Sequence, residues 1–336
     1  MQCSTELQEN LEKAEKKIRE AAAEGANIIL LPELFEREYF CQNMGKRQVT
    51  VAAVQMQCTN HPQENLKKAE KMVRQAAAAG AQIILLSELF EREYFCQQRR
   101  YDFYSYAKPV EENEAVCWGQ KLAKELKVVL PISFYEKEVN NLYNSVACID
   151  ADGELLGVYR KTHIPDDHYY QEKFYFTPGD TGFRVFDTRY GKIGVGICWD
   201  QWFPETARCM ALEGAELLFY PTAIGSEPIL ACDSMPHWRR CMQGHAAMNL
   251  MPVIAANRIG REEVKPCVEN GGQESSLIFY GSSFITDETG ELLQTASRDQ
   301  EEILTETFDL DELAAKRLEW GLFRDRRPKC YGKITE

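Results

Sequence analysis

The stretch G-K-I-G-V-G-I-C-W-D-Q-W-F-P-E, Gly191–Glu205, indicates a buried strand that ends in a turn toward a helix. Small residues lead to Cys198, and Pro204 suits the first turn of the following helix. A cysteine at such a turn lies at the C-terminal edge of a sheet, near backbone N–H groups and the positive end of a helix. Both features lower the pKa of a thiol and offer hydrogen bonds to an oxyanion. Cys198 is therefore a candidate nucleophile, although a buried core cysteine is the plainer interpretation of this position alone.

The segments that precede this turn alternate between strands and helices. Val49–Gln55 is apolar and β-branched, which predicts a buried strand. A helical period runs from Pro62 and stops at Gly80, and the strand Gln82–Leu86 follows. Glu88 comes just after that strand, at the sheet edge where α/β folds bind ligands. A surface charge at the start of a helix is the alternative interpretation of this glutamate.

The rest of the chain continues this alternation and adds hairpins, which predicts an α/β fold with helices on the faces of a mixed sheet. No strong linker signal follows residue 48, so one domain is expected there. The expected helices are Ala115–Leu126, Pro204–Gly214 and His237–Asn249, and the expected strands are Val128–Phe134, Tyr143–Ile149, Leu155–Tyr159, Phe183–Thr188, Lys192–Ile197, Glu216–Tyr220, Pro252–Asn257, Tyr280–Ile285 and Leu292–Gln294.

An internal repeat precedes this domain. Met1–Gln42 matches Met56–Gln97 at a constant offset, and 31 of the 42 aligned positions are identical. Two copies are too few for a solenoid or an array. We therefore expect residues 48–336 to form the folded unit, and residues 1–47 to be an incomplete duplicate of 56–102 that is peripheral or disordered. A duplicated exon and a genuine N-terminal arm both explain the extra copy, in which Glu33 is the counterpart of Glu88.

The composition excludes several functional classes. The chain has 336 residues and a net charge of −13, which disfavours a general nucleic-acid binder. No apolar run approaches the ~20 residues that span a bilayer, and no secretory signal is visible, so a cytoplasmic protein without a membrane partner is expected. Twelve cysteines in that setting are expected to be reduced thiols. None of their spacings is typical of a metal site or a thioredoxin-type pair.

Two further charged residues lie in unusual surroundings. Lys161 is in the segment Y-R-K-T-H-I-P, where a solvated lysine is the plainer interpretation. Glu172 is embedded among aromatic residues, where a carboxylate needs partners or its pKa rises. His163, His237 and His245 suggest a Cys–His thiol enzyme, but the spacing of His237 and His245 on an expected helix favours core or surface roles for these two.

Together, these residues carry a resemblance to a known family. Glu88, Lys161, Glu172 and Cys198 occur in L-L-S-E-L-F, Y-R-K-T-H-I-P, Y-Q-E-K-F-Y-F-T-P-G-D and G-I-C-W-D-Q-W-F-P-E. This order resembles the nitrilase superfamily of carbon–nitrogen hydrolases over essentially all of 48–336. Four longer stretches resemble its branch that hydrolyses N-carbamoylputrescine: I-C-W-D-Q-W-F-P-E, F-Y-P-T-A-I-G-S-E-P, H-W-R-R-C-M-Q-G-H-A and W-G-L-F-R-D-R-R-P.

The resemblance implies a fold, an activity and an assembly. The fold would be a four-layer α-β-β-α sandwich, and the protein a homo-oligomer that uses neither a metal nor an organic cofactor. The substrate would be a small cationic N-carbamoyl amine. Hydrolysis of N-carbamoylputrescine gives putrescine, carbon dioxide and ammonia, a step of polyamine biosynthesis.

The resemblance also implies the catalytic residues. Cys198 would be the nucleophile and Glu88 the general base and acid. Lys161 and the backbone N–H of Trp199 would hold the oxyanion. Glu172 would orient the site through Lys161 or the substrate amide.

The expected contacts with the rest of the substrate are less specific. Tyr94 and Thr222 are expected to bind substrate. The far ammonium calls for an acidic partner, for which Glu227 is the candidate and Asp166 and Asp167 are the alternatives. A solvated loop charge is the plainer interpretation of Glu227.

Other functions remain open at the level of sequence. The chain could act on another N-carbamoyl amine or acid, or on a simple amide. From a different class, it could be a catalytically silent assembly or binding protein, an interpretation that the N-terminal duplication keeps open.

Overall fold

The computed structural model describes residues 6–26, 28–31, 47–226 and 232–335. The chain divides into two units, Met1–Lys46 and Arg47–Glu336. The candidate Glu227, and Glu33, the counterpart of Glu88 that is not expected to be catalytic, lie outside the described residues.

The strand that leads to Cys198 lies second from one edge of a six-stranded mixed sheet. It pairs in parallel with the next strand along the chain and antiparallel with the strand before it. The order in this six-stranded sheet is β13 (Leu292–Thr295), β12 (Phe284–Thr286), β9 (Val253–Ala256), β8 (Leu217–Pro221), β7 (Gly191–Val195) and β6 (Val185–Thr188).

The strands of the other half form two three-stranded sheets. An isolated parallel bridge between Ile83 and Val129 joins them side by side. From one edge of this layer to the other, the strands are β14 (Glu302–Asp309), β1 (Gln48–Gln55), β2 (Ile83–Leu85), β3 (Leu130–Glu138), β4 (Asn141–Ile149) and β5 (Leu155–Arg160).

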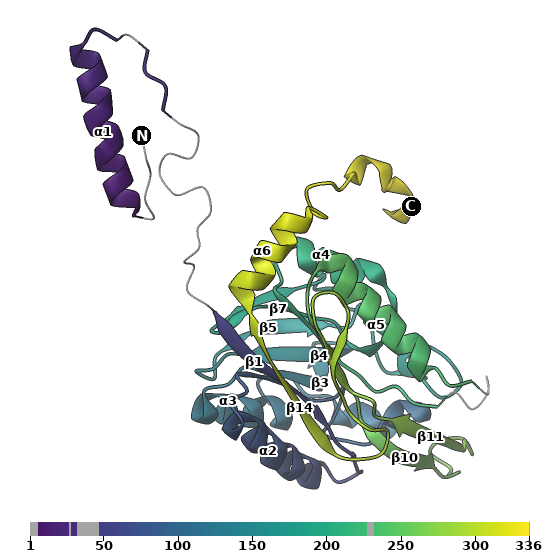
Figure 1. Ribbon diagram of the computed structural model, residues 1–336. Helices are drawn as coiled ribbons and strands as arrows, with labels where there is room; N and C mark the ends of the chain where they lie inside the picture. Colours follow the sequence, from purple (N-terminus) through teal and green to yellow (C-terminus); the bar gives the residue numbers. More distant parts are fainter. Residues whose placement is uncertain (1–5, 27, 32–46, 227–231, 336) are drawn as a thin grey trace. The chain divides into compact units, whose positions relative to one another are not determined.

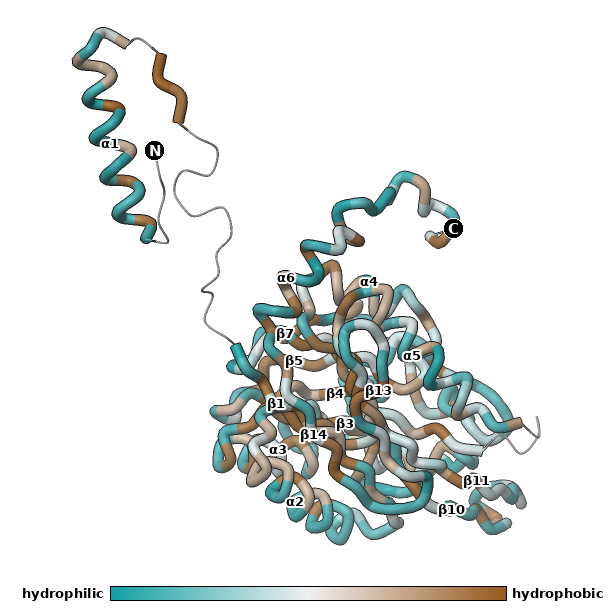
Figure 2. Tube along the Cα trace, viewed as in Figure 1, coloured by the Kyte–Doolittle hydropathy of each residue, from teal (hydrophilic) through white to brown (hydrophobic). Residues whose placement is uncertain are grey.

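Helices cover the outer faces of both layers (Figure 1). Alternating residues of β1, such as Val51 and Ala53, pack against β7 and β8 between the layers, whereas Ala52 and Val54 pack outward. The outward side of the first layer is covered by α2 (Pro62–Ala78) and α3 (Glu114–Leu126), and that of the second by α4 (Pro204–Leu212) and α5 (Met235–Asn249). The predicted four-layer α-β-β-α sandwich is confirmed, and Figure 2 shows its apolar strands.

The remaining elements are a helix, a two-stranded ribbon and short 3₁₀ turns. In α6, Leu310 and Leu313 extend the core between the layers. These elements are α6 (Leu310–Trp320), β10 (Ile259–Val264), β11 (Ser275–Tyr280), η1 (Phe95–Gln97), η2 (Tyr101–Tyr106), η3 (Glu172–Phe174), η4 (Cys198–Trp202), η5 (Pro328–Cys330) and η6 (Gly332–Thr335).

One predicted strand is wrong. Tyr280–Ile285 was expected to be continuous, but β11 ends at Tyr280 and β12 begins at Phe284. Gly281 and Ser282 between them have φ values of +52° and +58°, so the chain leaves the extended conformation there.

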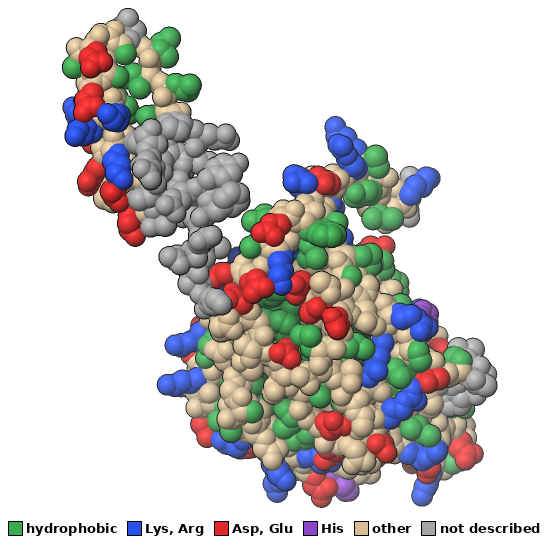
Figure 3. All heavy atoms as spheres, viewed as in Figure 1, with side chains coloured by type: hydrophobic (Ala, Val, Ile, Leu, Met, Phe, Trp, Pro, Cys, Tyr) green, Lys and Arg blue, Asp and Glu red, His purple; other side chains and the backbone are tan. Residues whose placement is uncertain are grey.

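The first unit contains α1 (Leu7–Ala23), the counterpart of α2. Leu11 and Ile18 are 40% and 38% exposed, whereas their counterparts Leu66 and Val73 are buried in the core. None of the helices in the described ranges combines the length and apolar character needed to cross a bilayer. The face of the second unit in Figure 3 intersperses acidic and basic side chains.

Candidate active site

The turn after β7 presents Cys198 in an unusual backbone conformation. Cys198 has φ +41°, a left-handed value that costs a non-glycine residue about 1–2 kcal/mol. The segment between β7 and Cys198 has no room for a side chain at position 196, because a Cβ on Gly196 would lie 2.7 Å from the ring of Tyr220. The Cys198 Sγ lies 3.8 Å from the carbonyl oxygen of Ala223. The predicted strand–turn–helix is therefore present, with the 3₁₀ turn η4 between Cys198 and α4.

Glu88 is fully buried just beyond the end of β2. Its Oε1 accepts hydrogen bonds from Lys161 Nζ at 2.8 Å and Asn144 Nδ2 at 2.7 Å. Its Oε2 is buried and has no hydrogen-bond partner among the described residues. One carboxylate oxygen is thus held in place while the other is left to accept a proton.

Lys161 lies between two buried carboxylates. Its Nζ is 2.8 Å from Glu88 and 2.7 Å from Oε2 of Glu172. The other oxygen of Glu172, Oε1, accepts a hydrogen bond from the Tyr94 hydroxyl at 2.6 Å. Lys161 is fully buried, so this cation is compensated by direct contact rather than by water.

The charges of this cluster follow from burial and from one another. Burial alone lowers the pKa of Lys161, but Glu172 and Glu88 together raise it well above its usual value, so the ammonium form persists. Burial raises the pKa of Glu172 to about 7 against the lowering effect of Lys161, and Glu88 adds to the rise.

The expected lowering of the thiol pKa is wrong. Burial, followed by the charge of Glu88, raises the pKa of Cys198 well above its usual value. The turn is five residues of 3₁₀ helix, whose positive end does not offset that burial. Burial therefore favours the neutral thiol, and a nucleophilic role for Cys198 would require a base to remove its proton.

A cavity of about 590 Å³ opens onto the thiol. Its charged lining residues in the described part of the chain are all acidic, namely Asp166, Asp167, Glu172 and Asp233. Asp233 pairs with Arg298 at 2.6 Å, whereas Asp166 and Asp167 have no ion-pair partner within the described ranges. The other described lining residues are Pro165, Tyr170, Cys198, Trp199, Trp202, Ala223, Ile224, Cys232, Ser234 and His237.

The structure separates the four expected substrate contacts. Trp199 lines the cavity and is 40% exposed. Tyr94 is buried behind Glu172, to which its hydroxyl donates. Thr222 is buried, and its hydroxyl lies 3.1 Å from Gln201 Oε1 while its carbonyl oxygen accepts the Glu88 N–H at 3.4 Å. Glu227 belongs to the range that is not described.

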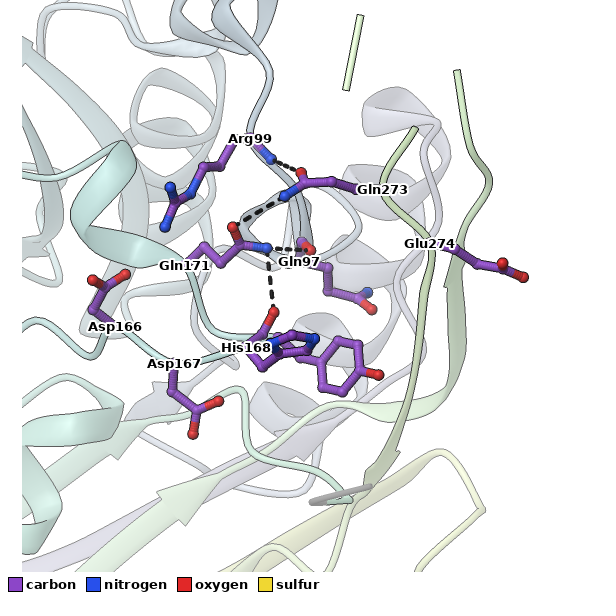
Figure 4. Close-up of a pocket in the computed structure, with 9 residues that line it drawn as sticks. Gln97, Arg99, Asp166, Asp167, His168, Gln171, Gln273 and Glu274 are labelled. Atoms are coloured by element: carbon purple, nitrogen blue, oxygen red, sulfur yellow. Dashed lines mark hydrogen bonds between the residues drawn. The ribbon is translucent and has the colours of Figure 1, made fainter. Parts of the chain in front are cut away.

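A second, more polar pocket of about 450 Å³ shares Asp166 and Asp167 with the cavity (Figure 4). Its wall is built from amides that hydrogen-bond to one another, with Gln273 donating to Gln171 at 3.4 Å and Gln171 donating to the Gln97 carbonyl at 2.9 Å. Figure 4 shows the side chains of Asp166 and Asp167 at the edge of this pocket.

Sequence reasoning missed Asn144 and Arg258. Asn144 holds Glu88, and its signal was a polar residue inside the buried run of β4. Arg258 is fully buried and donates to the carbonyl oxygens of Glu88 at 2.7 Å and Leu89 at 2.9 Å. No pattern in the sequence distinguishes it from a surface arginine after a strand.

Comparisons with known proteins identify the family of this chain. The carbon–nitrogen hydrolase family matches residues 50–318. The N-carbamoylputrescine amidase of Oryza sativa subsp. japonica is 58% identical over 284 residues, which cover 84% of this chain and 93% of the relative. The citrullinase of Francisella tularensis subsp. tularensis is 52% identical over 288 residues, 85% of this chain and 98% of the relative.

A solved structure extends the comparison to the fold. The crystal structure of a carbon–nitrogen hydrolase from Helicobacter pylori G27 superposes with a TM-score of 0.79 at 36% identity, covering 86% of this chain and 99% of that chain. The family match covers most of the Arg47–Glu336 unit, including Glu88, Lys161 and Cys198. The chain therefore belongs to the carbon–nitrogen hydrolase family of the nitrilase superfamily, as its motifs predicted.

Proposed function

We propose that this chain hydrolyses N-carbamoylputrescine to putrescine, carbon dioxide and ammonia, with Cys198, Glu88, Lys161 and Glu172 as its catalytic residues. The observation that carries the proposal is the buried Glu88–Lys161–Glu172 cluster beside a thiol that opens onto an acidic cavity. The rice relative supports the choice of substrate.

The first half of the reaction forms a covalent intermediate. A urea-type carbonyl is a poor electrophile, because two nitrogens donate electrons into it. Cys198 attacks the carbamoyl carbon as the partnerless Oε2 of Glu88 takes the thiol proton. Coupling the two events removes the need for a resting thiolate, which burial disfavours.

Charge then develops on the carbonyl oxygen. The Lys161 ammonium and the backbone N–H of Trp199 stabilise it, and one such donor is typically worth about 10²–10³ in rate. Glu172 keeps Lys161 in place, because it accepts a hydrogen bond from the Lys161 ammonium on one oxygen and is itself held by the Tyr94 hydroxyl on the other. The tetrahedral intermediate collapses when Glu88 returns its proton to the leaving nitrogen.

The second half regenerates the thiol. Glu88 takes a proton from water, which attacks the carbamoyl thioester, and Cys198 leaves as its sulfur regains a proton. The carbamic acid that is released loses carbon dioxide and frees the second nitrogen. In total, one N-carbamoylputrescine and one water give one putrescine, one ammonia and one carbon dioxide, so the atoms balance.

The far end of the substrate is an ammonium. Asp166 and Asp167 line the cavity and form no ion pair within the described ranges, although Arg99 lines the adjoining pocket with them, so they replace Glu227 as our candidates for its partners. Trp199 and Trp202 add aromatic faces that attract cations.

Citrulline is the second candidate substrate, because the Francisella relative is a citrullinase. It shares the ureido group but adds a carboxylate beside its ammonium. The described lining of the cavity has no Lys or Arg, so this carboxylate would face Asp166 and Asp167. Electrostatics therefore favours the diamine derivative.

A substrate panel tests the choice. We expect the purified full chain to release ammonia and putrescine from N-carbamoylputrescine with a higher kcat/KM than from citrulline or N-carbamoyl amino acids. Equal or faster turnover of a carboxylated substrate would reject the proposed specificity, and no turnover of any member would reject the hydrolase activity.

The setting of the enzyme is also proposed. We infer a cytoplasmic homo-oligomer that acts in polyamine biosynthesis, with residues 48–336 as the hydrolase domain. Support comes from the cysteine-rich composition and from the family resemblance. Light scattering of the purified chain measures the assembly directly.

A further inference from the structure

The Asp200 carboxylate is the best-satisfied acidic group near the thiol. Asp200 is fully buried and accepts four hydrogen bonds. Its Oδ2 accepts from the Ile197 N–H at 2.9 Å and the Tyr159 hydroxyl at 2.7 Å. Its Oδ1 accepts from the His163 N–H at 3.0 Å and lies 2.7 Å from His163 Nδ1. No reaction step proposed above uses it.

The donors come from both halves of the catalytic cluster. Ile197 directly precedes Cys198, so its bond to Asp200 closes the turn that carries the nucleophile. Tyr159 and His163 lie two residues before and two residues after Lys161. One carboxylate therefore ties the Cys198 turn to both sides of the segment that carries the oxyanion-binding cation.

A ring contact reinforces this connection. The His163 ring stacks on Phe203 with centroids 3.6 Å apart and an interplanar angle of 5°. Phe203 follows η4 directly, so it belongs to the same turn as Asp200. Stacking fixes the plane of the imidazole and directs Nδ1 toward the carboxylate, away from any role as a base for Cys198.

We propose that Asp200 is a positioning residue, which sets the distance between the Cys198 thiol and the Lys161 ammonium. The proposal rests on the proposed function for its kinetic readout. It explains how Cys198 keeps a left-handed φ of +41° next to a regular strand, because the hydrogen bonds to Asp200 determine the conformation of the turn.

The chemistry requires a carboxylate at this position. Each oxygen accepts one backbone N–H, Ile197 on Oδ2 and His163 on Oδ1. An asparagine has only one acceptor oxygen, so either orientation of its amide faces one N–H group with its own NH₂. Asp200→Asn keeps the volume and still loosens one of the two segments.

The kinetic test compares two variants at the site with one elsewhere. We expect Asp200→Asn to lower kcat about 100-fold with KM within about twofold of the wild type, because small displacements of reacting groups cost about that much. Tyr159→Phe removes one donor and should lower kcat about fivefold. If Asp200→Asn fails to fold, the kcat of Tyr159→Phe alone tests the positioning role of Asp200.

The control is Asp309→Ala. Asp309 accepts the N–H groups of Asp311 and Glu312 at the start of α6. It pairs with Gln48, at the opposite end of β1 from the end beside Glu88. This variant should lower the unfolding temperature and leave kcat unchanged.

A second readout is independent of the substrate. The rate at which iodoacetamide alkylates Cys198, followed by mass spectrometry of its peptide, should fall at least tenfold in Asp200→Asn and remain unchanged in Asp309→Ala. If the wild type hydrolyses nothing in the panel but this pattern holds, the proposed function fails and the positioning role stands. Wild-type kcat in Tyr159→Phe, or equal kcat losses in all three variants, would overturn the positioning role.

Discussion

At the scale of single residues, the proposed reaction depends on the Cys198 thiol, whose pKa burial raises well above its usual value. Cys198→Ser should therefore lower kcat at least about 10³-fold, because a hydroxyl is a far weaker acid and nucleophile in the same place. Ammonia release from N-carbamoylputrescine measures the loss. A serine variant with most of the wild-type turnover would show that Cys198 is not the nucleophile.

Glu172 gives the site a pH dependence. Both of its oxygens accept hydrogen bonds, so the ionised form fits the cluster. Its pKa is raised to about 7, and protonation below that pH turns one acceptor into a donor. We expect kcat to fall as pH decreases through about 7. Glu172→Gln should have lower activity throughout and lack this fall, and a variant that keeps it would assign the titration to another group.

Asp166 and Asp167 should affect binding more than chemistry. Asp166→Asn with Asp167→Asn should raise KM for N-carbamoylputrescine about fivefold and leave kcat within about twofold, because exposed ion pairs contribute up to about 1 kcal/mol. The uncharged analogue N-butylurea is the matched control, and its KM should not change. A similar rise for both substrates would mean that these residues shape the cavity without recognising charge.

At the scale of elements, close backbone packing holds the Lys161 segment. Gly179 donates its N–H to the Lys161 carbonyl at 2.8 Å, and a Cβ there would clash with the Arg160 carbonyl. Gly179→Ala should lower kcat at least about tenfold, because displaced catalytic groups lose rate steeply. The control Gly244→Ala, in the interior of α5 with only an ordinary contact at 3.6 Å, should retain kcat and gain about 0.5–1 kcal/mol of stability. Unchanged activity in Gly179→Ala would contradict this account.

The elements also show what sequence patterns can predict. The strand that leads to Cys198 and the strand before Glu88 were predictable, because each combines an apolar run with a chemical group at its end. β14 was not predicted, because its polar, half-exposed pattern depends on antiparallel pairing with β1, more than 240 residues away in the chain, as in Gln55 with Glu302. The sequence also could not predict that one oxygen of Glu88 lacks a hydrogen-bond partner among the described residues, because this depends on which neighbours reach the other oxygen.

At the scale of the whole molecule, the two copies of the repeat are not equally suited to supply the helix that packs on the sheet at the position of α2. α2 buries Met72 against the sheet, and the corresponding residue of α1 is Lys17, which is 65% exposed. Placing that ammonium in an apolar core without a partner costs several kcal/mol. This difference adds a physical reason for the second copy to be the one within the hydrolase domain.

Removal of the first copy tests this assignment. A chain that begins at Arg47 keeps the ion pairs of Arg47 with Glu216 and Asp311, together with every catalytic residue proposed here. We expect its kcat, KM and unfolding temperature to match those of the full chain. A loss of activity on truncation would assign residues 1–46 a part in the active enzyme.

The burial of Cys198 also bears on how the protein withstands oxidants. Hydrogen peroxide reacts with thiolates far faster than with thiols, and it offers no carbonyl oxygen to the Lys161 ammonium. Cys198 is buried with a pKa that burial raises well above its usual value, whereas Cys232 and Cys330 are exposed. Among the described cysteines, oxidation should therefore reach these two exposed sulfurs first, and the proposed nucleophile should stay reduced even after Cys232, which lines the same cavity, has been modified.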